Sequence, residues 1–535
     1  MAAPGFLRLS SAAASAALQQ SSRYASTLLR SSGKRAVVQN TWTTTTGGGS
    51  LITAAAVAVA AIHSSACLAA SPATKDVSMT SSFSSSSHIL GGWFQVPDLA
   101  LRNHYFVVPL DYDSPDGTSI SIFAREVVGT GKEEKQLPYL LYLQGGPGFE
   151  CGRPTEAGGW VKKACEEYRV ILLDQRGTGL STPLTTSALS QFSSPKQQAS
   201  YLQHFRADNI VRDAEYVRNC LVQDDEAWTV LGQSFGGFCA VTYLSMAPGG
   251  LQHVLLTGGL PPVDDGCMAE TVYRALYKRV VLQNAKFYER FPEDENIVRL
   301  IVLHLAEAEA GGVPLPSGGI LTPHGLQLLG LTGLGSAGGF ERLHYILERA
   351  WDPELVPGSK KTLSFTFLRM VENWIDFDTN PLYAIMHEAI YCQGAASKWA
   401  AHRVRQELGD QFDAVKSVSN GSRVLFTGEM IFPWMFDEIA ALRPLKEVAN
   451  ILAEKADWPP LYNKQLLNAN KVPVAAAVYY EDLYVDFSLS QATAAQISGI
   501  RLWVTNEYMH SGIREDGSRI LDQLFGMIKG KFPLR

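Results

Sequence analysis

The sequence has no cysteine framework, no excess of basic charge and no strong transmembrane candidate. Its seven cysteines are odd in number and scattered, without a C-x-x-C pair, which excludes a disulfide scaffold or a structural zinc site. Asp and Glu (52) outnumber Lys and Arg (46), so the charge pattern gives no indication of a nucleic-acid partner. The apolar run 51–62 (LITAAAVAVAAI) is shorter than the roughly 18–20 residues that a transmembrane helix needs, and we expect no stable membrane insertion.

Acidic residues are absent from the first 75 residues, which carry six Lys or Arg among many Ser, Ala and Thr. This composition is typical of an organellar transit peptide. We therefore expect a chloroplast or mitochondrial location after its removal, with a bipartite or secretory signal, a membrane anchor and a cytoplasmic location as alternatives. The tract 81–87 (SSFSSSS) is typical of a linker. Residues 1–87 are thus predicted to be a disordered targeting segment and linker, and folded sequence to begin near His88.

Beyond the linker, strand and helix patterns alternate, which favours a parallel sheet covered on both faces. A hairpin-like pair opens this part of the chain at 104–111 and 119–128. Apolar strands are predicted at 138–144, 168–174, 228–232 and 253–257, and helices at 209–221 and 238–246. The pattern returns in strands at 472–480 and 499–505 and a helix at 519–529. We predict an α/β fold with a mostly parallel central sheet flanked by helices.

The alternation stops between the two stretches. From 263 to 465 the patterns are mostly helical, for example at 269–288 and 295–309, with a Gly-rich loop at 311–338. This is too long for a crossover connection. We predict an inserted helical cap domain at 263–465, between core parts at 88–262 and 466–535.

Ser234 lies in the G-x-S-x-G motif of the chain, GQSFG (232–236). An apolar strand precedes the motif and a small-residue helix follows it, as a nucleophile elbow requires. A serine hydroxyl needs a base, and His510 lies just beyond a late apolar strand. Asp482 follows the strand 472–480, and the order Ser…Asp…His is that of the α/β-hydrolases. Asp486 and Glu429 are the alternative acids.

A second glycine-rich turn, GGPG (145–148), follows the predicted strand 138–144. Glycines let a backbone approach a substrate carbonyl closely. The backbone N–H groups of Phe235 and of this turn are therefore predicted to form an oxyanion hole.

Three motifs in order, QGGPG (144–148), DQRGTGLSTP (174–183) and GQSFGG (232–237), resemble those of the proline iminopeptidase family of α/β-hydrolases. The similarity is to the larger plant and microbial members. It covers roughly 88–262 and 465–535 and, more loosely, the helical insert. The resemblance implies that the catalytic serine, aspartate and histidine are Ser234, Asp482 and His510. It also implies that the oxyanion glycine is Gly145 or Gly146.

The resemblance also implies the activity. It points to a serine aminopeptidase that releases N-terminal residues, proline preferred, from short peptides with a free N-terminus through an acyl-enzyme. Two features depart from the family pattern: Gln144 stands where the family usually has His, and the helical insert is large.

An aminopeptidase must bind a cationic α-amine, and in a desolvated pocket that charge needs a carboxylate partner. Glu388, in HEAIYC (387–392), aligns by pattern with the family's amine-binding glutamate and is the first candidate. Glu429, framed by aromatic residues, is the second, and Glu150 is the third.

An esterase or another small-molecule hydrolase on the same fold is the alternative function, and a pocket without an amine-binding carboxylate would favour it. A non-catalytic binding protein is a third interpretation, and the complete Ser…Asp…His set counts against it. No metal or organic cofactor is implied. His387 and Glu388 begin like the zinc motif H-E-x-x-H, but Tyr391 occupies the place of the second histidine.

Overall fold

The computed structural model describes residues 88–222, 226–264, 268–374 and 377–531. The predicted targeting segment and linker, 1–87, lie outside the described residues. The five cysteines within the described ranges are all unpaired, and all except Cys220 are buried. Among the helices of these ranges, none combines the length and the apolar character that crossing a membrane would require.

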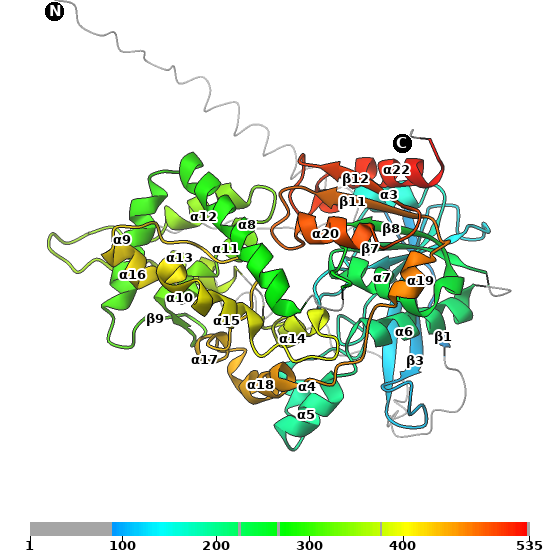
Figure 1. Cartoon of the computed structure of the whole chain (residues 1–535), viewed down its shortest axis with the longest axis horizontal. Coiled ribbons are helices and arrows are strands. Elements are labelled where there is room, and N and C mark those ends of the chain that lie inside the picture. Colours follow the sequence, from blue (N-terminus) through cyan, green and yellow to red (C-terminus); the bar gives the residue numbers. More distant parts are fainter. Residues whose placement is uncertain (1–87, 223–225, 265–267, 375–376, 532–535) are drawn as a thin grey trace, which may run out of the picture. The chain divides into compact units, whose positions relative to one another are not determined.

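A ten-stranded sheet forms the centre of the fold (Figure 1), in the order β1-β3-β4-β6-β5-β7-β8-β11-β12, with β2 paired to β3. The early strands β1–β4 pair antiparallel, as do β4 and β6, and from β6 to β12 neighbouring strands are parallel. The strands are β1 (His88–Leu90), β2 (Phe94–Val96), β3 (Leu99–Pro109), β4 (Ser119–Gly129), β5 (Tyr139–Leu143), β6 (Arg169–Leu173), β7 (Trp228–Gln233), β8 (Leu251–Thr257), β11 (Val474–Tyr479) and β12 (Ile500–Thr505). The predicted, mostly parallel sheet is confirmed.

The central strands are apolar on both faces because helices cover both faces of the sheet. Every residue of β6 and of β7 is buried. Successive residues point to opposite faces, so Leu141 packs in one apolar cluster with α6 (Ala207–Leu221) and α7 (Phe235–Met246). Leu140 packs in a second cluster with α3 (Gly159–Ala164) and α22 (Gly517–Ile528). Shorter elements complete this part: α4 (Thr186–Leu189), α5 (Pro195–Leu202), η2 (Pro248–Gly250), α19 (Lys464–Asn468), α20 (Phe487–Ala494) and α21 (Gly512–Glu515).

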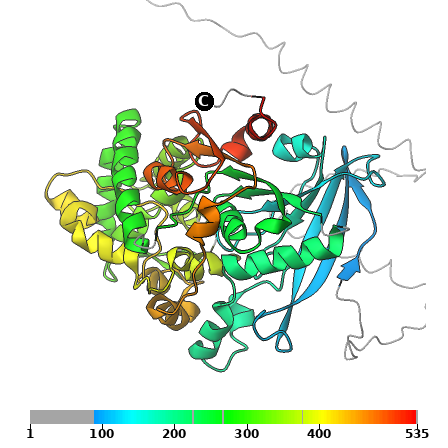
Figure 2. The same cartoon turned by 45° about the vertical axis from the view of Figure 1, so that its right-hand side comes forward.

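Between β8 and β11 the chain is mainly helical, and we call residues 268–454 the helical segment. In Figures 1 and 2 it lies beside the sheet, coloured green to orange. Its elements are α8 (Ala269–Arg290), α9 (Asp294–Ala306), β9 (Val313–Pro314), β10 (Ile320–Leu321), α10 (Pro323–Gln327), α11 (Gly330–Gly333), α12 (Gly339–Leu347), α13 (Phe365–Glu372), α14 (Pro381–Met386), η3 (Glu388–Tyr391), α15 (Ala400–Glu407), η4 (Gly409–Phe412), α16 (Ala414–Ser419), α17 (Met435–Glu438), η5 (Arg443–Leu445) and α18 (Lys446–Glu454). A separate cap domain bounded at 263–465 stays a prediction.

The stretch 311–338, predicted as a loop, instead contains β9, β10, α10 and α11. The start of α10 has a physical cause. Pro323 occupies the first turn, and the side chain of Thr322 accepts a hydrogen bond from the backbone N–H of Gly325, which is a typical N-terminal cap.

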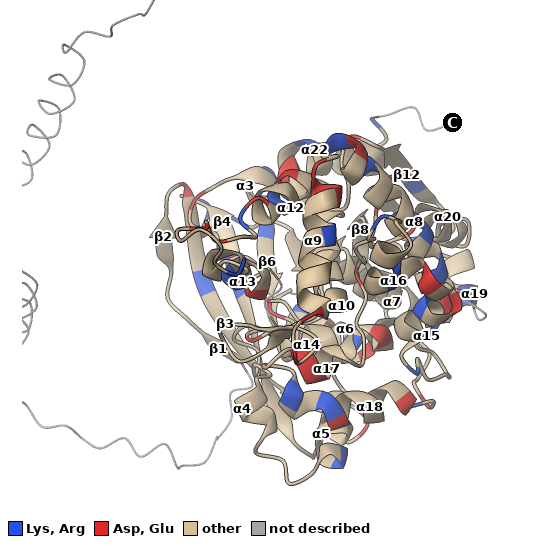
Figure 3. Cartoon of the chain, turned by 90° about the vertical axis from the view of Figure 1, so that its left-hand side faces the viewer, with Lys and Arg blue, Asp and Glu red and all other residues tan. Residues whose placement is uncertain are grey.

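Charged side chains of both signs are interspersed over the helical segment (Figure 3). Some pair between elements, as Arg274 of α8 does with Glu407 of α15 at 2.9 Å. Such exposed pairs contribute little to stability individually.

Candidate active site

Ser234 lies at the sharp turn between β7 and α7, as predicted for a nucleophile elbow. Its backbone has φ 55° and ψ −125°, a conformation that a non-glycine residue adopts only at a cost of about 1–3 kcal/mol. The turn also requires glycine nearby, because a Cβ on Gly236 would collide with the carbonyl oxygen of Leu143 on β5. The glycine after the serine is therefore required by the close approach of the start of α7 to the end of β5.

The structure brings His510 and Asp482 together with Ser234. His510 Nε2 is 2.9 Å from Ser234 Oγ, and His510 Nδ1 is 2.8 Å from Asp482 Oδ2. The other carboxylate oxygen, Asp482 Oδ1, accepts the backbone N–H groups of Tyr484 and Val485. These contacts fix the carboxylate, the carboxylate fixes the imidazole, and the imidazole faces the hydroxyl, which is the geometry of an activated serine nucleophile.

The alternative acid Asp486 is occupied elsewhere. Its carboxylate accepts the backbone N–H groups of Ser488 and Leu489 at the start of α20 and pairs with Arg279. Asp486 therefore has a structural place, away from the imidazole.

The imidazole of His510 is buried and favours a proton more than an ordinary histidine does. Desolvation by burial lowers its pKa, but the charge of Asp482 and the hydrogen bond to it outweigh burial, so the pKa of His510 is raised above its usual value. A base of raised pKa accepts the serine proton more readily, which suits general-base catalysis near neutral pH.

The predicted oxyanion-hole residues lie beside the serine. Phe235 is the first residue of α7, where a backbone N–H has no acceptor within the helix. Gly145 approaches so closely that a Cβ there would lie 2.9 Å from Ser234 Cβ, and Gly145 and Gly146 both line the cavity that contains the serine. The arrangement places backbone around the position of a tetrahedral intermediate.

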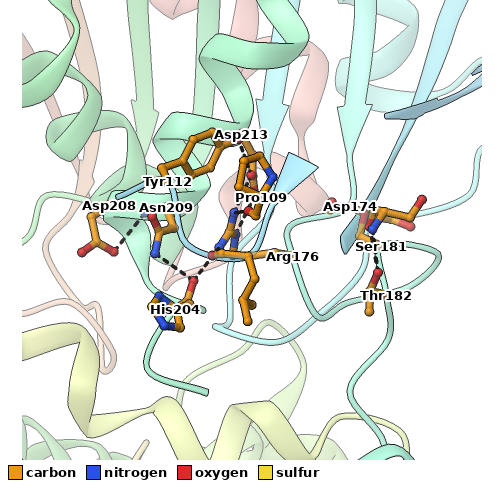
Figure 4. Close-up of polar contacts among 12 residues, drawn as sticks. Pro109, Tyr112, Asp174, Arg176, Ser181, Thr182, His204, Asp208, Asn209 and Asp213 are labelled. Atoms are coloured by element: carbon orange, nitrogen blue, oxygen red, sulfur yellow. Dashed lines mark hydrogen bonds and ion pairs between the residues drawn. The ribbon is translucent and has the colours of Figure 1, made fainter. Parts of the chain in front are cut away.

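The second motif, DQRGTG (174–179), is a support rather than a lining of this cavity (Figure 4). The guanidinium of Arg176 is buried, pairs with Asp213 of α6 at 2.6 Å, and donates to the carbonyls of Leu110 and His204. Asp174 accepts the backbone N–H of Cys151, three residues after GGPG. The motif thus ties the turn after β6 to β3, α6 and the GGPG turn.

A cavity of about 380 Å³ opens at the carboxyl ends of β5 and β7. Its wall includes Ser234 and His510 from the sheet side and Glu429, Tyr383 and Trp374 from the helical segment. Both parts of the chain therefore build the cavity, and its volume lies in the usual range for small-molecule sites.

Glu429 brings a carboxyl group into the same cavity as the serine and the histidine. Tyr383 of α14 donates its hydroxyl to Glu429 Oε1 at 2.7 Å. Burial raises the pKa of Glu429, while His510 and the Tyr383 hydroxyl lower it, and the net pKa is about 7. A cation entering the cavity would favour the ionised carboxylate.

Known proteins identify the family. A curated proline iminopeptidase from Aeromonas sobria is 51% identical over 79% of this chain and 95% of its own length. The chain belongs to the proline iminopeptidase family. A second relative, the proline iminopeptidase AneH of Aspergillus aculeatus, is 37% identical over 79% of this chain and 92% of its own length. The family model described as "alpha/beta hydrolase fold" also matches this chain, over residues 138–304.

A solved proline iminopeptidase from Mycobacterium smegmatis is similar at a TM-score of 0.37, with 14% identity over 80% of this chain and 98% of that chain. The family membership confirms the resemblance carried by the three sequence motifs, and the sheet described above is that of an α/β-hydrolase.

Glu388 and Glu429, the first two candidates for binding the substrate amine, have different surroundings in the structure. The two carboxylate oxygens of Glu388 accept the backbone N–H groups of Ala400 and Ala401, at 3.0 and 2.9 Å. Glu388 is not among the described residues that line the cavity of Ser234. The position of Glu429 in the cavity therefore favours it over Glu388, whose carboxylate accepts hydrogen bonds at the start of α15. Which of the two binds the amine stays a prediction.

The structure also shows the surroundings of Glu150 and the conformation of the chain around Glu429. Glu150, the third amine-binding candidate, is exposed and pairs with Arg153. Residues 423–429 form no strand. Glu429 instead lies in an irregular stretch held by packing.

Sequence reasoning missed Tyr383, Trp374 and Arg514, which all line the cavity. Tyr383 and Trp374 belong to the helical segment, where no motif marks a position relative to Ser234. Arg514 carried a usable signal, since it lies four residues after His510.

Proposed function

We propose that the chain is a serine aminopeptidase that releases N-terminal residues, with proline preferred, from short peptides through an acyl-enzyme. Membership of the proline iminopeptidase family supports this activity. The observation that carries it is the carboxyl group of Glu429 in the same cavity as Ser234 and His510.

Acylation begins with the Ser234 hydroxyl. Its Oγ attacks the carbonyl carbon of the N-terminal residue while its proton passes to His510 Nε2. The backbone N–H groups of Phe235 and of Gly145 or Gly146 stabilise the oxyanion. The imidazolium then donates the proton to the leaving nitrogen, the C–N bond breaks, and the N-terminal residue remains as an ester on the serine.

Deacylation repeats the sequence with water. His510 takes a proton from the water molecule, whose oxygen attacks the ester carbonyl, and then returns the proton to Ser234 Oγ as the ester bond breaks. Asp482 holds the imidazole in one tautomer during both halves. The free N-terminal amino acid is released.

Glu429 supplies what distinguishes an aminopeptidase from an esterase. The α-amine of a peptide has a pKa of about 7.7–8.0 and is largely cationic at neutral pH. In the cavity that charge pairs with the Glu429 carboxylate, which Tyr383 orients. The esterase alternative lacks a role for this buried carboxyl group.

The test is a panel of fluorogenic amides of Pro, Ala and Leu, each with a free α-amine, beside uncharged acyl esters of the same leaving group. We expect the Pro-amide to have the highest kcat/KM, and N-acetylation of the proline to abolish its hydrolysis. Faster turnover of the esters, or of the acetylated amide, would favour the esterase instead.

We propose a chloroplast or mitochondrial location on the composition of residues 1–75, which carry six basic and no acidic residues. N-terminal sequencing of protein from its native tissue should give a start between about 25 and 88. An intact Met1 in a cytosolic fraction would favour the cytoplasmic alternative.

A further inference from the structure

Arg514 places a positive charge in the wall of the cavity, directly beyond the catalytic histidine. It belongs to the short helix α21, which begins two residues after His510. The side chain is exposed and lines the cavity. Its one hydrogen bond to a described residue runs to Gln233 Oε1 at 3.2 Å, and no described carboxylate lies within ion-pair distance of it.

A second guanidinium, that of Arg342 in the helical segment, contacts a residue that lines the cavity. It lies on α12, is exposed, and its Nη2 donates to Ser336 Oγ. Ser336 lines the cavity together with Tyr484. The hydroxyl of Tyr484 lies near charges of both signs, those of Glu429 and Asp482 and, more weakly, those of Arg342 and Arg514. Arg342 also has no ion-pair partner among the described residues. Two unneutralised cations thus approach one wall.

The order of the chemistry indicates what faces these cations. The N-terminal residue of the substrate occupies the Glu429 side of Ser234, and His510 Nε2 protonates the leaving nitrogen. The leaving peptide therefore starts beside His510, on the side from which α21 continues to Arg514. Glu429 and Arg514 thus bring a carboxyl group and a guanidinium to the cavity of Ser234, and these charges match a substrate with opposite charges at its two ends.

We propose that Arg514, assisted by Arg342, binds the C-terminal carboxylate of the substrate, so that the enzyme selects short peptides with a free C-terminus. The proposal rests on the aminopeptidase function and deepens it. The planar guanidinium fork suits a carboxylate and can bind it through two parallel hydrogen bonds. C-terminally blocked peptides lack that carboxylate, and in a long chain the carboxylate lies far from the N-terminal bond.

The experiment compares prolyl-glycine with prolyl-glycinamide, which differ only in the charge of the C-terminus. We expect the wild-type kcat/KM to favour the free acid by roughly tenfold or more, as one charge-assisted hydrogen-bonded pair gives. The preference should shrink as salt is raised, because the cations are exposed. In the series from prolyl-glycine to prolyl-tetraglycine the preference for acid over amide should fall with length.

Variants locate the effect. Arg514→Gln should lower kcat/KM for the acid about tenfold more than for the amide, Arg342→Gln should act in the same direction less strongly, and Arg514→Lys should restore part of the preference because it keeps the charge without the fork. Arg299→Gln, on an exposed position of α9, is the matched control and should retain the wild-type ratio.

Each remaining outcome contradicts the proposal. Equal losses on acid and amide in Arg514→Gln would mean that Arg514 only holds Gln233 and the turn beside Gly145. A wild-type enzyme that hydrolyses prolyl-glycinamide as well as prolyl-glycine would reject the carboxylate site and leave the aminopeptidase intact. Hydrolysis of acyl esters without either prolyl substrate would instead reject the aminopeptidase function itself.

Discussion

The sheet and the helical segment contribute to the cavity by different physical means. Ser234, Asp482 and His510 each follow a parallel strand, β7, β11 and β12, so the backbone of the sheet alone brings them to one edge. Glu429 lies outside any helix or strand, and its position depends on contacts such as the Tyr383 hydroxyl. The turns after the strands thus place Ser234, Asp482 and His510. Tertiary packing of the helical segment places Glu429, the carboxyl group that we propose to bind the substrate amine.

The largest effect on activity is expected at Ser234, which the turn after β7 positions. Ser234→Ala should lower kcat roughly a million-fold, because nucleophile and base act as a unit. The substitution removes one oxygen from a turn whose backbone is fixed by Gly236, so the far-UV circular dichroism and the midpoint of thermal unfolding should stay near wild type. Near-normal turnover by the folded variant would contradict the assignment of the nucleophile.

The orientation of the base should matter next. Asp482→Asn should lower kcat about ten-thousand-fold, since the amide would hold His510 in the wrong tautomer. It also removes the charge that raises the pKa of His510, so the acidic limb of the pH–kcat profile should move to lower pH. A matched Asp486→Asn variant should keep the wild-type profile. Equal losses in both variants would reopen the choice of acid.

The same comparison explains what the sequence could predict. The strands, the elbow and the Ser…Asp…His order were predictable because apolar runs, glycines and chain order are local signals. The helical segment gave weaker signals. In 311–338 the high Gly content predicted a loop, although Thr322 and Pro323 cap a helix there. For Glu388 and Glu429, a sequence pattern cannot show which carboxylate accepts hydrogen bonds from backbone N–H groups further along the chain.

A smaller effect, confined to substrates with an amine, is expected at the helical segment. Glu429→Gln should raise KM for a Pro-amide by about 10- to 100-fold, as the loss of one buried charge-assisted hydrogen bond implies, and should spare an uncharged acyl ester. An equal effect on both substrates would mean that Glu429 acts on the triad instead.

The pH dependence sharpens this test. With a pKa of about 7 for Glu429, the wild-type KM for the Pro-amide should fall as pH rises through 7 and the carboxyl ionises. It should rise again above about 8, where the substrate amine loses its proton. Glu429→Gln should lose both changes, because the cationic amine then has no carboxylate to pair with. Ester hydrolysis measured in parallel separates the titration of His510.

The smallest effect on activity is expected at Glu388, a buried glutamate of the helical segment. Its oxygens accept the backbone N–H groups of Ala400 and Ala401, where a negative charge also interacts favourably with the N-terminus of α15. In Glu388→Gln the amide NH₂ would face one of these donors, and leaving a buried donor unpaired costs about 1–3 kcal/mol. The midpoint of urea unfolding should therefore fall. KM for the Pro-amide should change less than about threefold, which is no more than the usual error in assigning an energy to a single contact. Measured beside Glu429→Gln, the two variants should show opposite patterns: stability lost with substrate binding retained at Glu388, and substrate binding lost at Glu429. If Glu388→Gln raised KM as strongly as Glu429→Gln, the amine would have to reach both carboxylates, and α15 would have to release Glu388 when the substrate binds.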